Sequence, residues 1–122
     1  MIRKAQEKDN QRLLELCVSQ GWHSQIDHVE EFFEALKYSD TFVYEVNNEV
    51  AGFARVISDK TFCMYLCELV VDEKYRHQKI ATKLIDELFK LYPNTKLEVL
   101  SGCDEFYEAY GFEKKGNGFR KR

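Results

Sequence analysis

A cluster of cationic side chains stands where a helix is predicted to begin, a position from which it could bind an anion. The cluster consists of Lys74, Arg76, His77, Lys79 and Lys83. Helix N-termini carry a partial positive charge and favour acidic residues, so cations there are unfavourable unless an anion docks. Unpaired N–H groups of the first helical turn would add to the side-chain charges. The pattern indicates a phosphate site, with a solvated basic turn as the alternative explanation.

The helix that carries this cluster is predicted over residues 79–92, directly after an apolar strand over 61–71. Hydrophobic periodicity predicts the other elements in the same way. They are a strand at 2–5, helices around 13–18 and 29–36 capped by Asp9 and Asp27, strands at 41–46, 50–58 and 96–100, a helical turn at 106–110, and a last strand or small hairpin within 112–122. This order predicts an α/β (α+β) fold with a mixed, mostly antiparallel sheet and helices on both faces. The strand-to-helix junction at 71–79 is where such folds usually hold ligands.

Composition places the chain among single globular domains. Its 122 residues, 44% hydrophobic and 32% charged, fit one domain spanning 1–122 and exclude intrinsic disorder. No apolar run is long enough to cross a bilayer, and the polar sequence after Met1 excludes a signal peptide. The net charge of -3 argues against binding nucleic acid by bulk charge. We therefore expect a cytoplasmic protein with neither a nucleic acid nor a membrane as partner.

The four cysteines do not form a recognisable metal or disulfide pattern. Cys63 and Cys67 lie in the predicted strand over 61–71, and four strand residues separate them by roughly 13 Å. That spacing is too long for a shared disulfide or metal ion. We expect all four, including Cys17 and Cys103, to be reduced and mostly buried thiols, and we expect no metal site. Neither a Ser-His-Asp arrangement nor a GxxxxGK[ST] phosphate loop is present.

Three segments carry a resemblance to a known family. Residues 69–84, LVVDEKYRHQKIATKL, place Arg76 and Ala81 at the two ends of a six-residue pattern in which Lys79 is fourth. This segment resembles the coenzyme A loop of the GNAT superfamily N-acetyltransferases, Arg/Gln-x-x-Gly-x-Gly/Ala, with Lys79 in place of the middle glycine. FYEAYGF at 106–112 and GFARVISD at 52–59 resemble two further GNAT segments in the family's order. The chain is thus similar to a small single-domain bacterial-type member.

The resemblance implies that acetyl-CoA is the cosubstrate and lies in a splay between the fourth and fifth strands. Backbone groups of Leu69 and Val71 would bind the pantetheine arm, and a backbone N–H near Val70 would polarise the thioester carbonyl. Lysine at position 79 could obstruct the phosphates or add its own ammonium, and we expect binding to be retained because the ligand is anionic. The residues that would cradle the pyrophosphate are Arg76, His77, Gln78, Lys79, Ile80, Ala81 and Thr82.

Acetyl transfer to an amine needs an acid and a base. By the resemblance Tyr107 would be the general acid that protonates the leaving thiolate; its other interpretation is a packing aromatic beside Phe106. Glu68 and Glu98 interrupt apolar strands next to the implied splay, and a carboxylate there is costly without a partner or a task. Either could be the base. Either could instead pair with Arg55 or face solvent at a sheet edge.

The sequence leaves the acceptor open. Trp22 and His23 lie in the loop that borders the acceptor pocket in this fold, and they are weak candidates for substrate contact. The first interpretation is an acetyl-CoA-dependent N-acetyltransferase that acts on a small-molecule or peptide primary amine by direct attack in a ternary complex. The alternative is a degenerate GNAT-fold coenzyme A-binding or regulatory module without catalysis. An open sheet edge would favour a homodimer.

Overall fold

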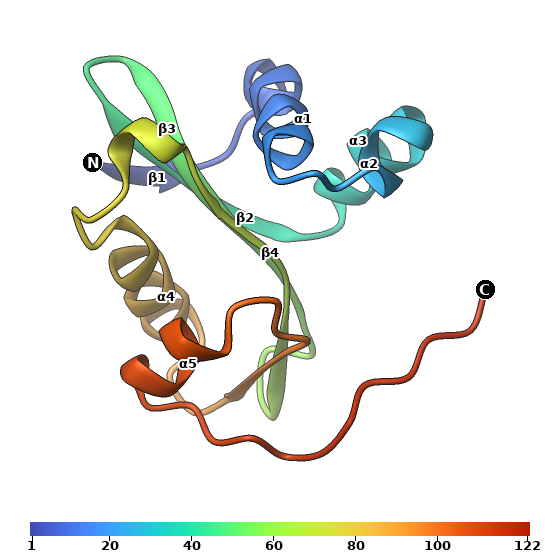
Figure 1. Cartoon of the computed structure of the whole chain (residues 1–122), viewed down its shortest axis with the longest axis vertical. Helices are drawn as coiled ribbons and strands as arrows, with labels where there is room; N and C mark the ends of the chain where they lie inside the picture. Colours follow the sequence, from blue (N-terminus) through green and yellow to red (C-terminus); the bar gives the residue numbers. More distant parts are fainter.

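A five-stranded sheet whose strands lie side by side in chain order forms the centre of the computed structural model, which describes all residues from 1 to 122 (Figure 1). β1 to β4 pair antiparallel, and β4 and β5 pair parallel. The mixed, mostly antiparallel sheet predicted from the sequence is thereby confirmed. The strands are β1 (Ile2–Lys4), β2 (Asp40–Val46), β3 (Glu49–Ser58), β4 (Cys63–Val71) and β5 (Lys96–Val99).

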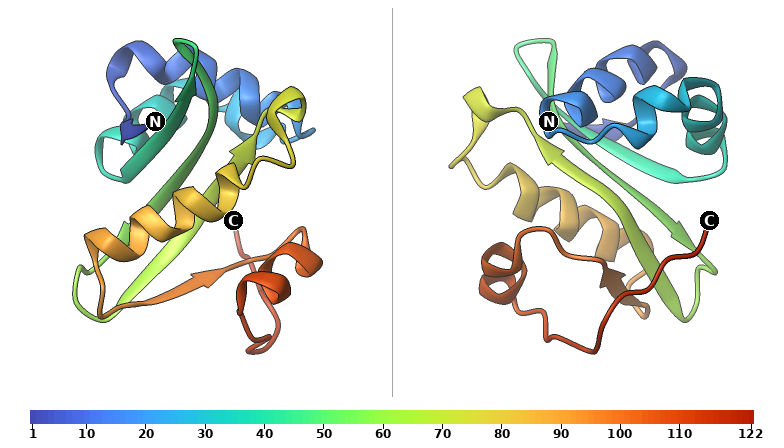
Figure 2. Two further views of the ribbon diagram at one scale, coloured as in Figure 1. Left: turned by 90° about the vertical axis from the view of Figure 1, so that its left-hand side faces the viewer. Right: turned by 45° about the vertical axis from the view of Figure 1, so that its right-hand side comes forward.

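Helices cover both faces of this sheet (Figure 2). One face carries α1 (Asn10–Ser19), α2 (Ser24–Asp27) and α3 (Val29–Lys37), and the opposite face carries α4 (Ile80–Leu91) and α5 (Asp104–Tyr110). Two short 3₁₀ turns, η1 (Glu7–Asp9) and η2 (Glu73–Tyr75), precede α1 and α4. No helix is both long enough and apolar enough to span a bilayer.

Each face has its own apolar core because the strands alternate their side chains between the two sides. On one face, α4 buries Leu84, Ile85 and Leu88 completely against strand residues such as Met64. Their spacing of one, three and four residues is that of a single helical face. The other core joins α1 and α3 to the strands; its members are Leu13, Leu14, Leu16, Cys17, Phe32, Val43, Val50, Phe53 and Val70.

The pairing of β4 changes in the middle of the strand. Glu68 lies opposite Arg55 while Leu66 lies opposite Val56, so Cys67 is one extra residue, a β-bulge. β5 pairs only with residues 63–66 of β4, which leaves residues 67–71 without a strand on that side. The splay between the fourth and fifth strands, implied by the resemblance, is therefore present and begins at the bulge.

Some local predictions are wrong. The side chain of Asp9 does not cap α1; it accepts hydrogen bonds from the Arg3 guanidinium and the Gln6 amide. Asp27 ends α2, and α3 starts after His28 without any side-chain cap. Residues 112–122 form no strand or hairpin, and they run as an irregular segment that is exposed from 113 onward (Figure 1).

The four cysteines are all free thiols. Only Cys17 is buried; Cys63 and Cys67 are half-buried and Cys103 is exposed, so the expectation of mostly buried thiols is wrong. Burial raises the pKa of the Cys17 thiol to about 12, so it stays protonated at neutral pH.

Candidate functional site

Six consecutive backbone N–H groups lack a hydrogen-bond partner where β4 leads into α4. They belong to residues 77–82, none of which donates a backbone hydrogen bond or reaches a side-chain acceptor. α4 begins at Ile80 without a side-chain cap, and its first turn contains no acidic residue. Free N–H groups and the helix dipole together can bind an anion, so we call residues 77–82 the candidate anion site.

Two residues of this turn adopt a left-handed backbone conformation. His77 has φ 65° and Lys79, the residue before the helix, has φ 60°. For an L-residue this conformation costs roughly 1–2 kcal/mol, and glycine avoids the cost. Lysine at position 79 thus keeps the backbone turn that a glycine would make. The turn that exposes the free N–H groups therefore forms with lysine at position 79.

The cationic side chains around the turn differ in how they are bound. Lys74 forms an ion pair with Glu49, with Nζ and Oε2 3.0 Å apart, so it is held away from the turn. Arg76 donates to the Gln20 side chain at 3.3 Å and remains exposed. Lys79 and Lys83 are exposed and have no carboxylate partner. These two ammonium groups are the charges most available to an anion.

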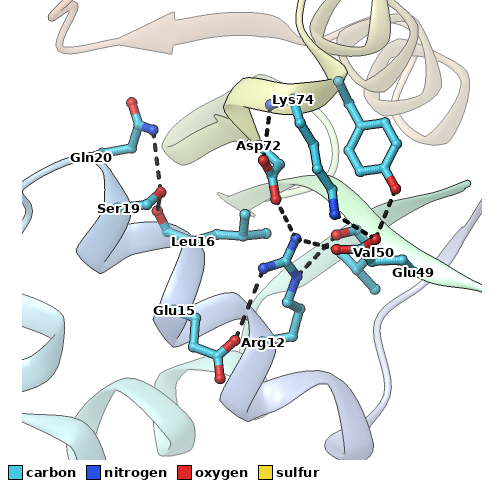
Figure 3. Close-up of polar contacts among 10 residues, drawn as sticks. Arg12, Glu15, Leu16, Ser19, Gln20, Glu49, Val50, Asp72 and Lys74 are labelled. Atoms are coloured by element: carbon cyan, nitrogen blue, oxygen red, sulfur yellow. Dashed lines mark hydrogen bonds and ion pairs between the residues drawn. The ribbon is translucent and has the colours of Figure 1, made fainter.

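Arg12 anchors the segment that leads into this turn (Figure 3). From α1 its guanidinium donates to the Asp72 carboxylate at 2.6 Å, to the Val50 carbonyl at 3.1 Å and to Glu49 at 3.2 Å. Asp72 also accepts from the Lys74 amide, and the hydrogen bond from Arg12 holds the pKa of Asp72 below its usual range. No local sequence pattern indicates this role, because the partners lie 37 to 60 residues from Arg12.

The open half of β4 presents free backbone groups next to the candidate anion site. The Asp72 amide donates to the Ala51 carbonyl of β3 at 2.7 Å. Because backbone groups alternate between the two sides of a strand, those of Val70 face β3 as well, whereas those of Leu69 and Val71 face the side without a strand. A backbone N–H that could polarise a carbonyl therefore comes from Leu69 or Val71 and not from Val70.

Glu68 is paired with Arg55, as one of the alternatives for it anticipated. The carboxylate is 5% exposed, and both its oxygens accept hydrogen bonds of 2.6 Å from Arg55. Arg55 also donates to Ser39 and lies over the ring of Phe32 on the α1–α3 face. Burial lowers the pKa of Arg55, but its hydrogen bonds to Glu68 and the opposite charge outweigh this and raise it. Glu68 is thus bound on both oxygens.

Glu98 is the accessible carboxylate of the two. It is exposed, and its nearest cation, Lys96, lies 3.6 Å away. Its neighbour Leu97 points into the core under α4, so Glu98 points to the opposite face, the side of α1 to α3. Both predicted carboxylates therefore lie on the same face of the sheet, and Glu98 alone is open to solvent.

Tyr107 lies on the other face, in α5. Its ring packs edge-on against Phe106 and Phe112, with centroids 5.1 and 5.2 Å away, in keeping with the packing interpretation. Burial raises the pKa of Tyr107 to about 12, with a smaller contribution from nearby Cys103. The hydroxyl has no hydrogen-bond partner, whereas that of Tyr110 donates to Asp86 at 2.6 Å. Tyr107 is thus a neutral phenol with a free O–H at physiological pH.

Trp22 and His23 lie in the connection between α1 and α2, on the same face as the two glutamates, and both are exposed. A cavity of about 350 Å³ lies elsewhere, between the start of β2, β1 and the end of α3. Its lining includes Lys4, Lys37 and Thr41 but none of the site residues predicted from the sequence.

Solved structures share this fold over the whole chain. A GNAT-family acetyltransferase from Streptococcus pneumoniae is 22% identical with a TM-score of 0.77, covering 100% of this chain and 98% of that one. Ribosomal-protein-alanine N-acetyltransferase from Brucella melitensis biovar Abortus is 16% identical with a TM-score of 0.77, covering 100% and 99%. Glucosamine-6-phosphate N-acetyltransferase from Arabidopsis thaliana is 19% identical with a TM-score of 0.73, covering 100% and 97%.

At the level of sequence, no curated protein matches the chain. A family model does match: the acetyltransferase (GNAT) domain aligns with residues 4–122, nearly the entire chain. The match spans residues 77–82, the open half of β4 and α5 together. The chain therefore belongs to the GNAT family of acetyltransferase domains.

Proposed function

We propose that the protein is an N-acetyltransferase that moves the acetyl group of acetyl-CoA to a primary amine by direct attack in a ternary complex. One observation carries the proposal: the six unpaired N–H groups of residues 77–82 adjoin the open half of β4. Together they offer an anion site followed by an extended backbone edge. A nucleotide diphosphate with an amide-containing arm has the matching chemistry.

The binding groups in this proposal are mostly backbone atoms. The N–H groups of residues 77–82 would hold the pyrophosphate, and the ammonium groups of Lys79 and Lys83 would add opposite charge. Leu69 and Val71 would pair with the pantetheine arm as an added strand. An N–H of the same stretch would stabilise the negative charge that develops on the thioester oxygen.

The two proton transfers fall to groups on opposite faces of the sheet. An amine near pH 7 is mostly ammonium, so it must lose a proton before it attacks. Glu98 is the better placed base, because it is exposed on the α1–α3 face, whereas both oxygens of Glu68 are bound by Arg55. Tyr107 supplies the proton for the leaving thiolate from its free hydroxyl. Glu68 then acts as a positioning residue that holds β4 through Arg55.

The acceptor in this proposal is a cationic amine. The net charge of -3 favours the approach of cations. Two structural neighbours are named as N-acetyltransferases, one for glucosamine 6-phosphate and one for a ribosomal-protein alanine. Polyamines, amino sugars and peptide amines are therefore the classes to screen, with Trp22 and His23 as the residues bordering the entrance.

Two measurements test the proposal. Acetyl-CoA should raise the melting temperature in a dose-dependent way, because a ligand that binds only the native state stabilises it. In a screen of amines, thiol release should depend on both acetyl-CoA and an acceptor. A missing thermal shift at millimolar acetyl-CoA would refute the proposal. Lys79 in the place of the glycine supports the second candidate, a non-catalytic coenzyme A-binding module, and a thermal shift without acceptor-dependent thiol release would favour it.

A further inference from the structure

The segment after α5 differs sharply in charge from the rest of the chain. Residues 113–122 contain a single acidic residue, Glu113. Since the segment carries a net charge of +4 and the whole chain -3, residues 1–112 carry -7. Such opposite charges attract the segment to the remainder of the molecule. Its five cations are Lys114, Lys115, Arg120, Lys121 and Arg122.

Two contacts fix where the last five residues lie. Gly118 packs against Leu100, closely enough that a Cβ on this glycine would come within 2.2 Å of the leucine side chain. Arg122 donates from Nη2 to the Ser24 hydroxyl of α2 at 3.3 Å. Four residue steps span at most roughly 14 Å. We call residues 118–122 the strap; it connects the end of β5 with α2 and lies on the α1–α3 side of the sheet (Figure 1).

The strap crosses the face on which the proposed acceptor would enter. Leu100 directly follows Val99, which pairs with Leu66 at the point where β4 and β5 separate. Ser24 directly follows His23 in the α1–α2 connection. The strap thus runs from the mouth of the splay to the entrance, over the face to which Glu98 points. Within it, Lys121 carries a primary amine and has no ion-pair partner.

We propose that Lys121 is acetylated by the active site of its own chain; this inference rests on the proposed function. The Lys121 ammonium first loses a proton to the base. Its nitrogen then forms a bond to the acetyl carbonyl carbon, and the carbon–sulfur bond of the thioester breaks. The nitrogen gives up its second proton and the thiolate takes one up, so the products are N-acetyl-lysine, free coenzyme A and the proton held by the base. The reaction needs no co-reactant besides acetyl-CoA.

The other two lysines of the segment are matched controls. Lys114 and Lys115 precede the contact of Gly118 with Leu100, so they are not part of the strap. Lys115 is also held by an ion pair with Glu113 at 3.0 Å. An amine tethered within reach of the thioester would have a high effective concentration, an advantage that amines elsewhere on the chain would lack. Lys121 should therefore be modified faster than either control.

The experiment incubates the whole protein with isotope-labelled acetyl-CoA and quantifies acetylation of each lysine by peptide mass spectrometry. We expect Lys121 to be acetylated at least tenfold faster than Lys114 and Lys115, with a first-order rate constant that is unchanged on tenfold dilution of the protein. Protein unfolded in urea gives the rate of uncatalysed acetylation. Lys121→Arg keeps the charge and should abolish the fast modification while still transferring acetyl groups to an external amine.

Each outcome decides the inference. Equal rates at the three lysines, a Lys121 rate no faster than in urea, or a rate proportional to protein concentration would each overturn acetylation within the chain. An external amine in a parallel reaction separates the two proposals. If it is acetylated while Lys121 is not, the inference fails and the proposed function stands. If neither is acetylated and acetyl-CoA gives no thermal shift, both fail.

Discussion

Reversing the charge of Lys79 is the sharpest test of the candidate anion site. Lys79 precedes α4 with φ 60°, and its side chain is exposed without a carboxylate partner. If the phosphates lie against the N–H groups of residues 77–82, the ammonium lies within a side-chain length of them. Lys79→Glu would then replace an attraction by a repulsion and should weaken acetyl-CoA binding.

The size of the effect follows from Coulomb's law. Two unit charges about 6 Å apart in water interact by about 0.7 kcal/mol. A change of two charge units against about two phosphate charges gives about 3 kcal/mol, which screening with a Debye length of about 8 Å reduces to roughly 1.3 kcal/mol. The expected change is about tenfold in the dissociation constant. In 1 M salt, where the Debye length is about 3 Å, it should shrink to about twofold.

Isothermal titration of acetyl-CoA at two salt concentrations measures this effect, and Lys90→Glu is the matched control. Lys90 is an exposed lysine of the same helix, α4, and lies about 16 Å away at 1.5 Å per residue, so the same charge reversal should change binding by less than twofold. An unchanged dissociation constant in Lys79→Glu, or an equal loss in both variants, would refute the placement of the phosphates.

Lys79→Gly separates the two ways in which lysine could act. If the Cβ of lysine obstructs the phosphates, glycine should tighten binding relative to the wild type. If the ammonium contributes, glycine should weaken binding by about threefold. Removing one charge changes the electrostatic free energy by half as much as reversing it. We expect weakening, because the backbone already adopts the left-handed conformation that glycine would supply.

Five further variants, one of them a double variant, test the rest of the site. Tyr107→Phe should lower turnover at least tenfold and leave the thermal shift with acetyl-CoA unchanged; unchanged turnover would exclude it as the acid. The pKa of Tyr107 is raised to about 12, so the folded state keeps a proton that the unfolded state loses above pH 10. The free energy of unfolding should therefore fall from pH 10 to 12, and less so in Tyr107→Phe, as measured by urea titration. Glu98→Gln should remove the acidic limb of the pH–rate profile; a persisting limb would exclude it as the base. Arg55→Met should destabilise the fold by about 3 kcal/mol because it leaves Glu68 buried without its partner, and Arg55→Met/Glu68→Leu should recover most of that loss in urea unfolding. Arg12→Ala should raise KM for acetyl-CoA at constant kcat, because Arg12 holds the segment that leads into the turn. A fall in kcat as large as the rise in KM would contradict a role confined to the turn.

Hydrophobic periodicity predicted most helices and strands, because the periodicity of a helix or strand involves only residues that are close in sequence. The helix expected at 79–92 is α4 at 80–91, and the strand expected at 61–71 is β4 at 63–71. The strand or hairpin expected within 112–122 is absent. Beyond Phe112 that segment has one apolar side chain, Phe119, among five cations, so a strand there would have no apolar face to bury.

The candidate anion site could be proposed from the sequence because all of its parts lie within one turn of the chain; that it binds an anion stays a prediction. Whether Glu68 is paired or free could not be predicted. The answer depends on the register of β3 and β4, which places Arg55 opposite Glu68. The bulge at Cys67 and the anchoring role of Arg12 are likewise invisible. Both depend on pairings between residues far apart in sequence, and neither composition nor periodicity contains information about such pairings.

The binding groups proposed here depend little on the identity of the side chains. Residues 77–82, Leu69 and Val71 would all act through backbone atoms, and every non-proline residue supplies the same N–H and C=O groups. What the site demands from side chains is indirect: Arg12 must hold the turn, and position 79 must accept a positive φ. By the same reasoning a lysine can replace the loop glycine, provided that the left-handed turn, and with it the row of free N–H groups, is retained.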